Sequence, residues 1–174
     1  KGVGAGARAG HGMFDTIYDL PIHALVVHGV VVLVPLAAAG VLLLCVRPGL
    51  RGTNVGWSVA GLAVVGAALA FVARQSGLEL EKRVGAGARG VIAEQIADHK
   101  SFGILTVWYA LAMAVAAVAL VVSARRKVSR TVGAVIVAVA VVTAGSAAVQ
   151  VVLTGHSGSV AVWKCTIVPE ECSG

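Results

Sequence analysis

Residues 21–46 read PIHALVVHGVVVLVPLAAAGVLLLCV, an apolar run without a single lysine, arginine, aspartate or glutamate. A helix needs about 20 residues to cross the hydrocarbon of a bilayer, and this run is long enough. The whole chain of 174 residues is 58% hydrophobic and only 13% charged, whereas soluble domains are about 25% charged. The run therefore predicts a membrane-spanning helix and, with it, an integral membrane protein.

Three more apolar runs follow the first, separated by polar connections. The four runs predict helices at residues 21–46, 55–74, 92–124 and 131–154. The second run is rich in glycine and alanine, which close helix packing in lipid favours. The expected fold is therefore all-α: an integral membrane four-helix up-down bundle that occupies residues 21–163.

Charged residues distinguish the two ends of this bundle. The two short turns contain basic residues and no acidic ones, and these basic residues are Arg47, Arg51, Arg125, Arg126, Lys127 and Arg130. All eight acidic residues fall on the opposite side, namely Asp15, Asp19, Glu79, Glu81, Glu94, Asp98, Glu170 and Glu171. The positive-inside rule places short basic turns in the cytoplasm. Both termini are then expected on the outer side, periplasmic or extracellular.

The two ends of the chain are expected to lie outside the bundle. Residues 1–20 begin rich in glycine and alanine and then mix aromatic with polar side chains, which predicts a flexible or interfacial segment. Residues 164–174 form an extracytoplasmic tail with Cys165 and Cys172, and a disulfide between these cysteines suits an oxidising compartment. Cys45, at the cytoplasmic end of its helix, is interpreted as a small packing residue.

Four histidines gather on the outer side of three helices, namely His23, His28, His99 and His156. An ionisable residue in or near the hydrocarbon is energetically unfavourable, so it is a functional hypothesis by default. His28 lies five residues below His23, which is roughly 7.5 Å deeper and about 140° around a helix. The two rings are therefore expected to have different roles, with His28 turned into the bundle and His23 at its rim.

Two imidazoles that face each other across a bundle can be the axial ligands of a b-type haem. The first and third helices of an up-down bundle are diagonal, which makes His28 and His99 the predicted ligand pair. His23 and His156 would lie near the haem edge, and Arg74 could pair with a propionate at the outer surface. The leading hypothesis is thus a protein that binds haem b and transfers electrons.

Two other interpretations of the histidines stay open. Neutral imidazoles also bind zinc and copper, and catalytic zinc sites often use three protein ligands, so His23, His99 and His156 form an alternative metal site. The histidines can also be structural, which fits a non-redox accessory subunit that packs through small-residue faces. Nucleic acid is not expected as a partner, because the basic residues flank apolar runs instead of forming a patch with interleaved aromatics.

Four short motifs are spread over the bundle: a His-x4-His opening, an early tryptophan in the second helix, a histidine at the head of the third, and Gly-His-x-Gly after the fourth. They are His23 with His28, Trp57, His99, and residues 155–158. With these motifs the chain resembles, over residues 21–163, the four-helix membrane proteins grouped as domain of unknown function 2231. It departs from the family pattern at Ala24, where proline is frequent, and at residues 160–163, where VAVW stands in place of a Leu-Val-Tyr segment.

The resemblance implies a multi-pass protein of the bacterial inner membrane, in a family sometimes suspected of carrying haem, and it implies no established activity. We therefore expect an electron-transfer protein, or an accessory subunit of a respiratory or other redox complex, in preference to an independent enzyme. The expected partners are membrane lipid, other subunits of such a complex, and a quinone.

Overall fold

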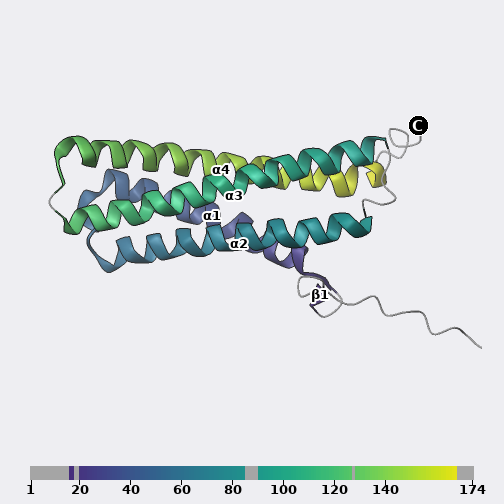
Figure 1. The fold of residues 1–174 in the computed structure, drawn as a ribbon, viewed down its shortest axis with the longest axis horizontal. Helices are drawn as coiled ribbons and strands as arrows, with labels where there is room; N and C mark the ends of the chain where they lie inside the picture. The colour runs from purple at the N-terminus through teal and green to yellow at the C-terminus, as the bar shows by residue number, and fades with distance from the viewer. Residues whose placement is uncertain (1–15, 18–19, 85–89, 127, 168–174) are drawn as a thin grey trace, which may run out of the picture.

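Four long helices form an antiparallel bundle in the computed structural model, which describes residues 16–17, 20–84, 90–126 and 128–167 (Figure 1). The helices are α1 (Ile22–Val46), α2 (Asn54–Val84), α3 (Val91–Arg125) and α4 (Arg130–Ile167). Each is long and apolar enough to cross a membrane. The predicted all-α architecture with four membrane-capable helices is confirmed.

The helices follow one another around the bundle, because α1 packs against α2 and α4 while α3 packs against the same two neighbours. Helices α1 and α3 are therefore diagonal and touch little along their length. The start of α1 and the end of α4 lie at one end of the bundle, together with the end of α2 and the start of α3 (Figure 1). We call this end the histidine end, and the opposite end, with the turns after α1 and α3, the arginine end.

Two helices are longer than the sequence predicted. Helix α2 continues to Val84 instead of ending near residue 74, and α4 continues to Ile167 instead of ending near residue 154. The extra turns of α2 are polar, and ion pairs such as Lys82 Nζ to Glu79 Oε1 at 2.8 Å support an exposed helix. Hydropathy marks only the part of a helix that is immersed in lipid, so it underestimated both lengths.

The arginine end closes α1 with side-chain hydrogen bonds. Pro48–Leu50 forms a short 3-10 turn, η1, directly after α1. The Arg51 guanidinium donates from Nε to the Leu44 carbonyl at 2.8 Å and from Nη2 to the Cys45 carbonyl at 3.0 Å. Because the last carbonyls of a helix have no partner within it, Arg51 caps α1 and fixes the turn into α2. At the other end of α1, strands β1 (Thr16–Ile17) and β2 (Leu20–Pro21) pair antiparallel.

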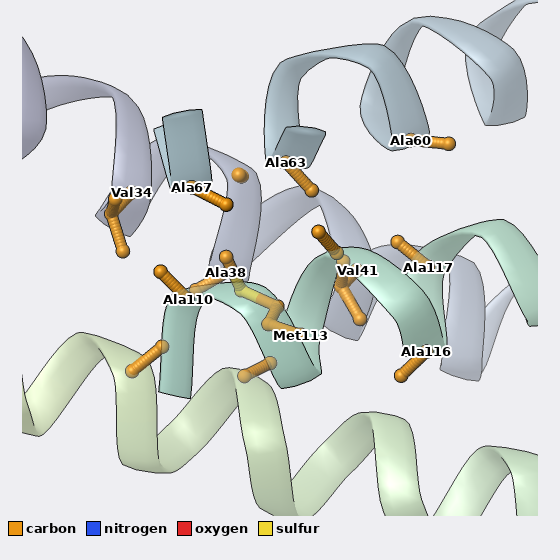
Figure 2. Close-up of a cluster of buried hydrophobic side chains, with 14 of the residues drawn as sticks. Val34, Ala38, Val41, Ala60, Ala63, Ala67, Ala110, Met113, Ala116 and Ala117 are labelled. Atoms are coloured by element: carbon orange, nitrogen blue, oxygen red, sulfur yellow. The ribbon is translucent and has the colours of Figure 1, made fainter. Parts of the chain in front are cut away.

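Small side chains fill the middle of the bundle (Figure 2). The core lies between valines of α1 and alanines of α2 and α3, with Met113 as its one long, fully buried side chain among those labelled in Figure 2. A Cβ at Gly66 would lie 3.2 Å from the Val34 side chain, so α1 and α2 approach closely there. Other apolar residues point outward, for example Val32 and Val152 with 63% and 67% of their surface exposed. An outward apolar surface suits contact with lipid.

Candidate functional site

The rings of His23 and His99 meet at the histidine end. His23 lies in the first turn of α1, and His99 lies in the third turn of α3, so the contact joins the two diagonal helices. Their ring centroids are 6.3 Å apart and their planes stand at 83° to each other. Both side chains are half-buried. This is the place where imidazoles from separate parts of the chain come together.

Helix α2 holds the His23 ring by its Nδ1 edge. Nδ1 lies 2.9 Å from the Ala73 carbonyl oxygen and 3.4 Å from Ser76 Oγ. The hydroxyl of Ser76, which is only 1% exposed, itself donates to the Ala73 carbonyl at 3.0 Å. A Cβ at Gly77 would lie 3.0 Å from His23 Cε1, so only glycine lets the ring rest against α2 without displacement. We call Ala73, Ser76 and Gly77 the α2 clasp.

Helix α4 holds the His99 ring in the same way. Nδ1 lies 3.1 Å from the Thr154 carbonyl oxygen and 3.1 Å from Ser157 Oγ. Ser157 Oγ donates to the Thr154 carbonyl at 2.9 Å. A Cβ at Gly158 would come within 2.9 Å of His99 Cε1. Thr154, Ser157 and Gly158 form the α4 clasp.

The two clasps follow one rule: a carbonyl at position i, a serine at i+3 and a glycine at i+4 hold a ring from the preceding helix of the chain. The helix pairs α1–α2 and α3–α4 thus repeat the same local arrangement. A backbone carbonyl only accepts hydrogen bonds, so Nδ1 carries the proton in each neutral ring. Nε2 of both rings is then the nitrogen with a free lone pair, the form in which histidine binds metals.

Buried polar groups continue below the α4 clasp. Thr106 Oγ1 of α3 and Thr154 Oγ1 of α4 are 2.7 Å apart, and Gln150 Nε2 donates to the Phe102 carbonyl at 3.4 Å. Thr106 and Gln150 are both buried. These contacts join α3 to α4 directly beneath His99, where hydrogen bonds between helices replace water as the partner of polar groups.

The orientation predicted for the two histidines of α1 is wrong. His23, expected at the rim, turns inward to His99, while His28, expected inside as the partner of His99, is exposed on the outside of α1. His28 Nδ1 lies 2.6 Å from the Ala24 carbonyl of its own helix. Both residues lie within the α-helix Ile22–Val46, and the angle of about 140° between positions five apart places the two rings on different sides of it.

The remaining predicted ligands do not join the pair. His156 is exposed on α4, so the three-histidine zinc or copper site is not assembled. Within the described residues, no group of three or more His, Cys, Asp or Glu side chains could hold a metal ion. Arg74 is half-buried beside the α2 clasp and donates to Gln75 Oε1 at 3.4 Å. The predicted Cys165–Cys172 disulfide lies outside the side chains that the structure describes.

One further buried polar atom lies one helical turn above His99. Gln95 Oε1 of α3 is buried and has no hydrogen-bond partner among the described residues. Gln95 and His99 are four residues apart, so they share one face of α3. Since buried polar groups in proteins are nearly always hydrogen-bonded, Gln95 is a candidate contact for a polar group of a ligand.

Sequence reasoning located both rings but missed the residues that orient them. Ser76, Gly77, Ser157 and Gly158 were not predicted as site residues, although each Ser-Gly pair is visible in the sequence. The signal was weak, because the two pairs become equivalent only when each is matched to a histidine on another helix.

Comparison with known proteins gives one family. The family model described as predicted membrane protein (DUF2231) matches residues 19–170. The match covers most of the chain, so the chain belongs to this family, as the motifs in its sequence indicated. Comparison with curated proteins and with solved structures gives no match.

Proposed function

We propose that this DUF2231 protein binds a b-type haem between His23 and His99 and transfers electrons at the outer side of the bacterial inner membrane. The observation that carries the proposal is the pair of rings from diagonal helices, each fixed in the same tautomer by its own clasp. The pair of residues that would hold the haem differs from the one predicted from the sequence, because His23 takes the place of His28.

The separation of the rings is compatible with both imidazoles bound to one metal. A bond of about 2.0 Å from metal to imidazole nitrogen, plus roughly 1.1 Å to the ring centre, places two opposed ring centres about 6.2 Å apart. The centroids of His23 and His99 are 6.3 Å apart.

The number of ligands supports haem over zinc. A haem iron takes four nitrogens from its porphyrin and needs two from the protein, whereas a zinc ion needs three or four protein ligands. When bound, haem would supply one-electron chemistry. The carbonyls of Ala73 and Thr154 would hold the ligand tautomers and make the rings more basic, as outer partners of metal-binding histidines do.

A polar group at the histidine end suits the rim of such a cofactor. Arg74 is half-buried and follows the clasp residue Ala73 in α2, so its guanidinium could pair with a propionate. We assign the arginine end to the cytoplasm by the positive-inside rule, which puts the histidine end outside. Such a small bundle would serve as an electron-transfer or accessory subunit of a larger redox complex.

An absorbance spectrum of the protein purified from membranes tests the proposal. We expect a Soret band that shifts on dithionite reduction, with one haem per chain by pyridine haemochrome assay. His23→Ala and His99→Ala should each remove most of the haem. The matched control is His156→Ala, which changes an exposed histidine next to the α4 clasp and should leave the haem content unchanged.

One result would refute haem binding, and the metal content of the protein would then separate the two alternatives. Protein that stays colourless after haem is supplied during expression would exclude a haem site. If that protein instead bound one monovalent copper ion per chain, and lost it in both ring variants, a two-coordinate copper site would replace haem, since copper also accepts imidazole ligands. If it bound neither, the two clasps would be structural, in line with a non-redox accessory subunit.

A further inference from the structure

His28 is a polar side chain on the lipid-facing side of α1. The exposed residues nearest to it on this side are apolar, namely Ala24, Leu25, Val31, Val32 and Leu36. The candidate membrane span of α1 runs from His23 to Val46, so His28 lies within it. An ionisable ring exposed to hydrocarbon is unfavourable and therefore indicates function.

The hydrogen bond within α1 defines what the His28 ring can bind. Nδ1 lies 2.6 Å from the Ala24 carbonyl oxygen, which only accepts, so the neutral ring carries its proton on Nδ1. Nε2 is then an acceptor, and no described residue donates to it. Leaving an acceptor unpaired in an apolar medium is costly. The ring therefore suits a hydrogen-bond donor that arrives from the membrane.

We propose that His28 binds the headgroup of a lipid-soluble quinol, whose hydroxyl donates to Nε2. Acyl chains offer no donor at this depth, roughly 7.5 Å below His23 along the helix. A quinol ring is apolar apart from its hydroxyl groups, which matches one acceptor among apolar side chains. The inference rests on the proposed function, because a quinol is also an electron donor, and His28 lies five residues from the ring that would bind haem.

Photolabelling in lipid nanodiscs tests the quinol site without relying on electron transfer. The probe is an azido-benzoquinone with a decyl tail, reduced to its quinol before illumination. We expect labelling of residues 24–36, competed by excess decyl-quinol. In His28→Leu, the affinity for decyl-quinol, measured from its competition with the probe, should fall about five- to tenfold, the effect of losing one hydrogen bond in an apolar site. His28→Gln, which keeps an acceptor oxygen, should retain most of the binding.

The matched control is His156→Leu, which removes an exposed histidine from another helix and should not change the labelling. Equal labelling of His28→Leu and the unchanged protein would overturn the quinol site. So would labelling that appears on a co-purifying subunit instead of α1, which would identify a partner helix as the occupant. Labelling at His28 in a colourless protein would refute only the haem, whereas haem without labelling would refute only the quinol site.

Discussion

Gly158→Ala should displace the His99 ring and disconnect it from its clasp. The added Cβ would lie 2.9 Å from Cε1 of that ring, whereas 3.5–4.0 Å is about the normal distance between non-bonded carbons. The overlap is thus roughly 0.6 Å or more. The ring cannot retreat freely, because Thr154 and Ser157 hold its Nδ1 edge and His23 lies beyond it.

The magnitude follows from two opposing effects. Overpacking a tight contact destabilises a fold by about 1–3 kcal/mol, whereas alanine stabilises a helix interior over glycine by about 0.5–1 kcal/mol. We expect Gly158→Ala to lower the free energy of unfolding by about 1–2 kcal/mol on balance. Gly155→Ala is the matched control, because its Cβ would meet nothing within 4 Å. It should be neutral or stabilising by up to about 1 kcal/mol.

The assay is reversible unfolding in mixed micelles followed by circular dichroism, with the haem content of each variant measured in parallel. Gly158→Ala should unfold at lower denaturant than Gly155→Ala and lose haem if His99 is a ligand. Gly77→Ala, with its Cβ 3.0 Å from His23 Cε1, should behave like Gly158→Ala because the two clasps are equivalent. Equal stability of Gly158→Ala and Gly155→Ala would refute the reasoning, whatever the haem content.

Two further variants test contacts that hold the bundle together. Thr106→Val should lose the 2.7 Å contact with Thr154 Oγ1 and destabilise the protein by about 0.6–1.7 kcal/mol. A double-mutant cycle with Thr154→Val measures this contact alone, and additive effects of the two variants would show that the hydroxyls do not interact. Arg51→Gln should leave the Leu44 and Cys45 carbonyls without their guanidinium donor and destabilise the protein by about 1–3 kcal/mol. Arg47→Gln is the control for lost charge, because Arg47 is exposed and lies near Arg51. An equal effect of both variants in the unfolding assay would show that the cap is unimportant.

The membrane bundle could be predicted because hydropathy and helix length are local properties of the sequence. A long apolar run such as residues 21–46 indicates a membrane-spanning helix by itself, without any knowledge of the neighbouring helices. Helix ends beyond the lipid carry no such signal, which explains why α2 was predicted to end ten residues early. The same holds for α4, which continues past residue 154 and includes Gly158, where the missing side chain accommodates a ring.

Which histidine faces inward could not be read from the sequence in the same way. The spacing of His23 and His28 fixes the angle between the two rings, but it leaves open the rotation of the whole helix. That rotation is set by packing: Val30, Val34 and Val41 are buried against the other helices, while Val32 and Leu36 are exposed. His23 lies on the side that continues toward the core, and His28 does not.

The two clasps explain why neither half of the bundle can form the site alone. Each clasp fixes one ring within a pair of consecutive helices, so His23 depends on α2 and His99 depends on α4. The rings meet only when the pairs α1–α2 and α3–α4 assemble, since α1 and α3 touch little elsewhere. A metal held by both rings would therefore stabilise the assembled bundle over its separate halves. Replacing either histidine by alanine should then lower the free energy of unfolding more when the metal is present than when it is absent. The difference between these two decreases measures how strongly the metal couples the two halves.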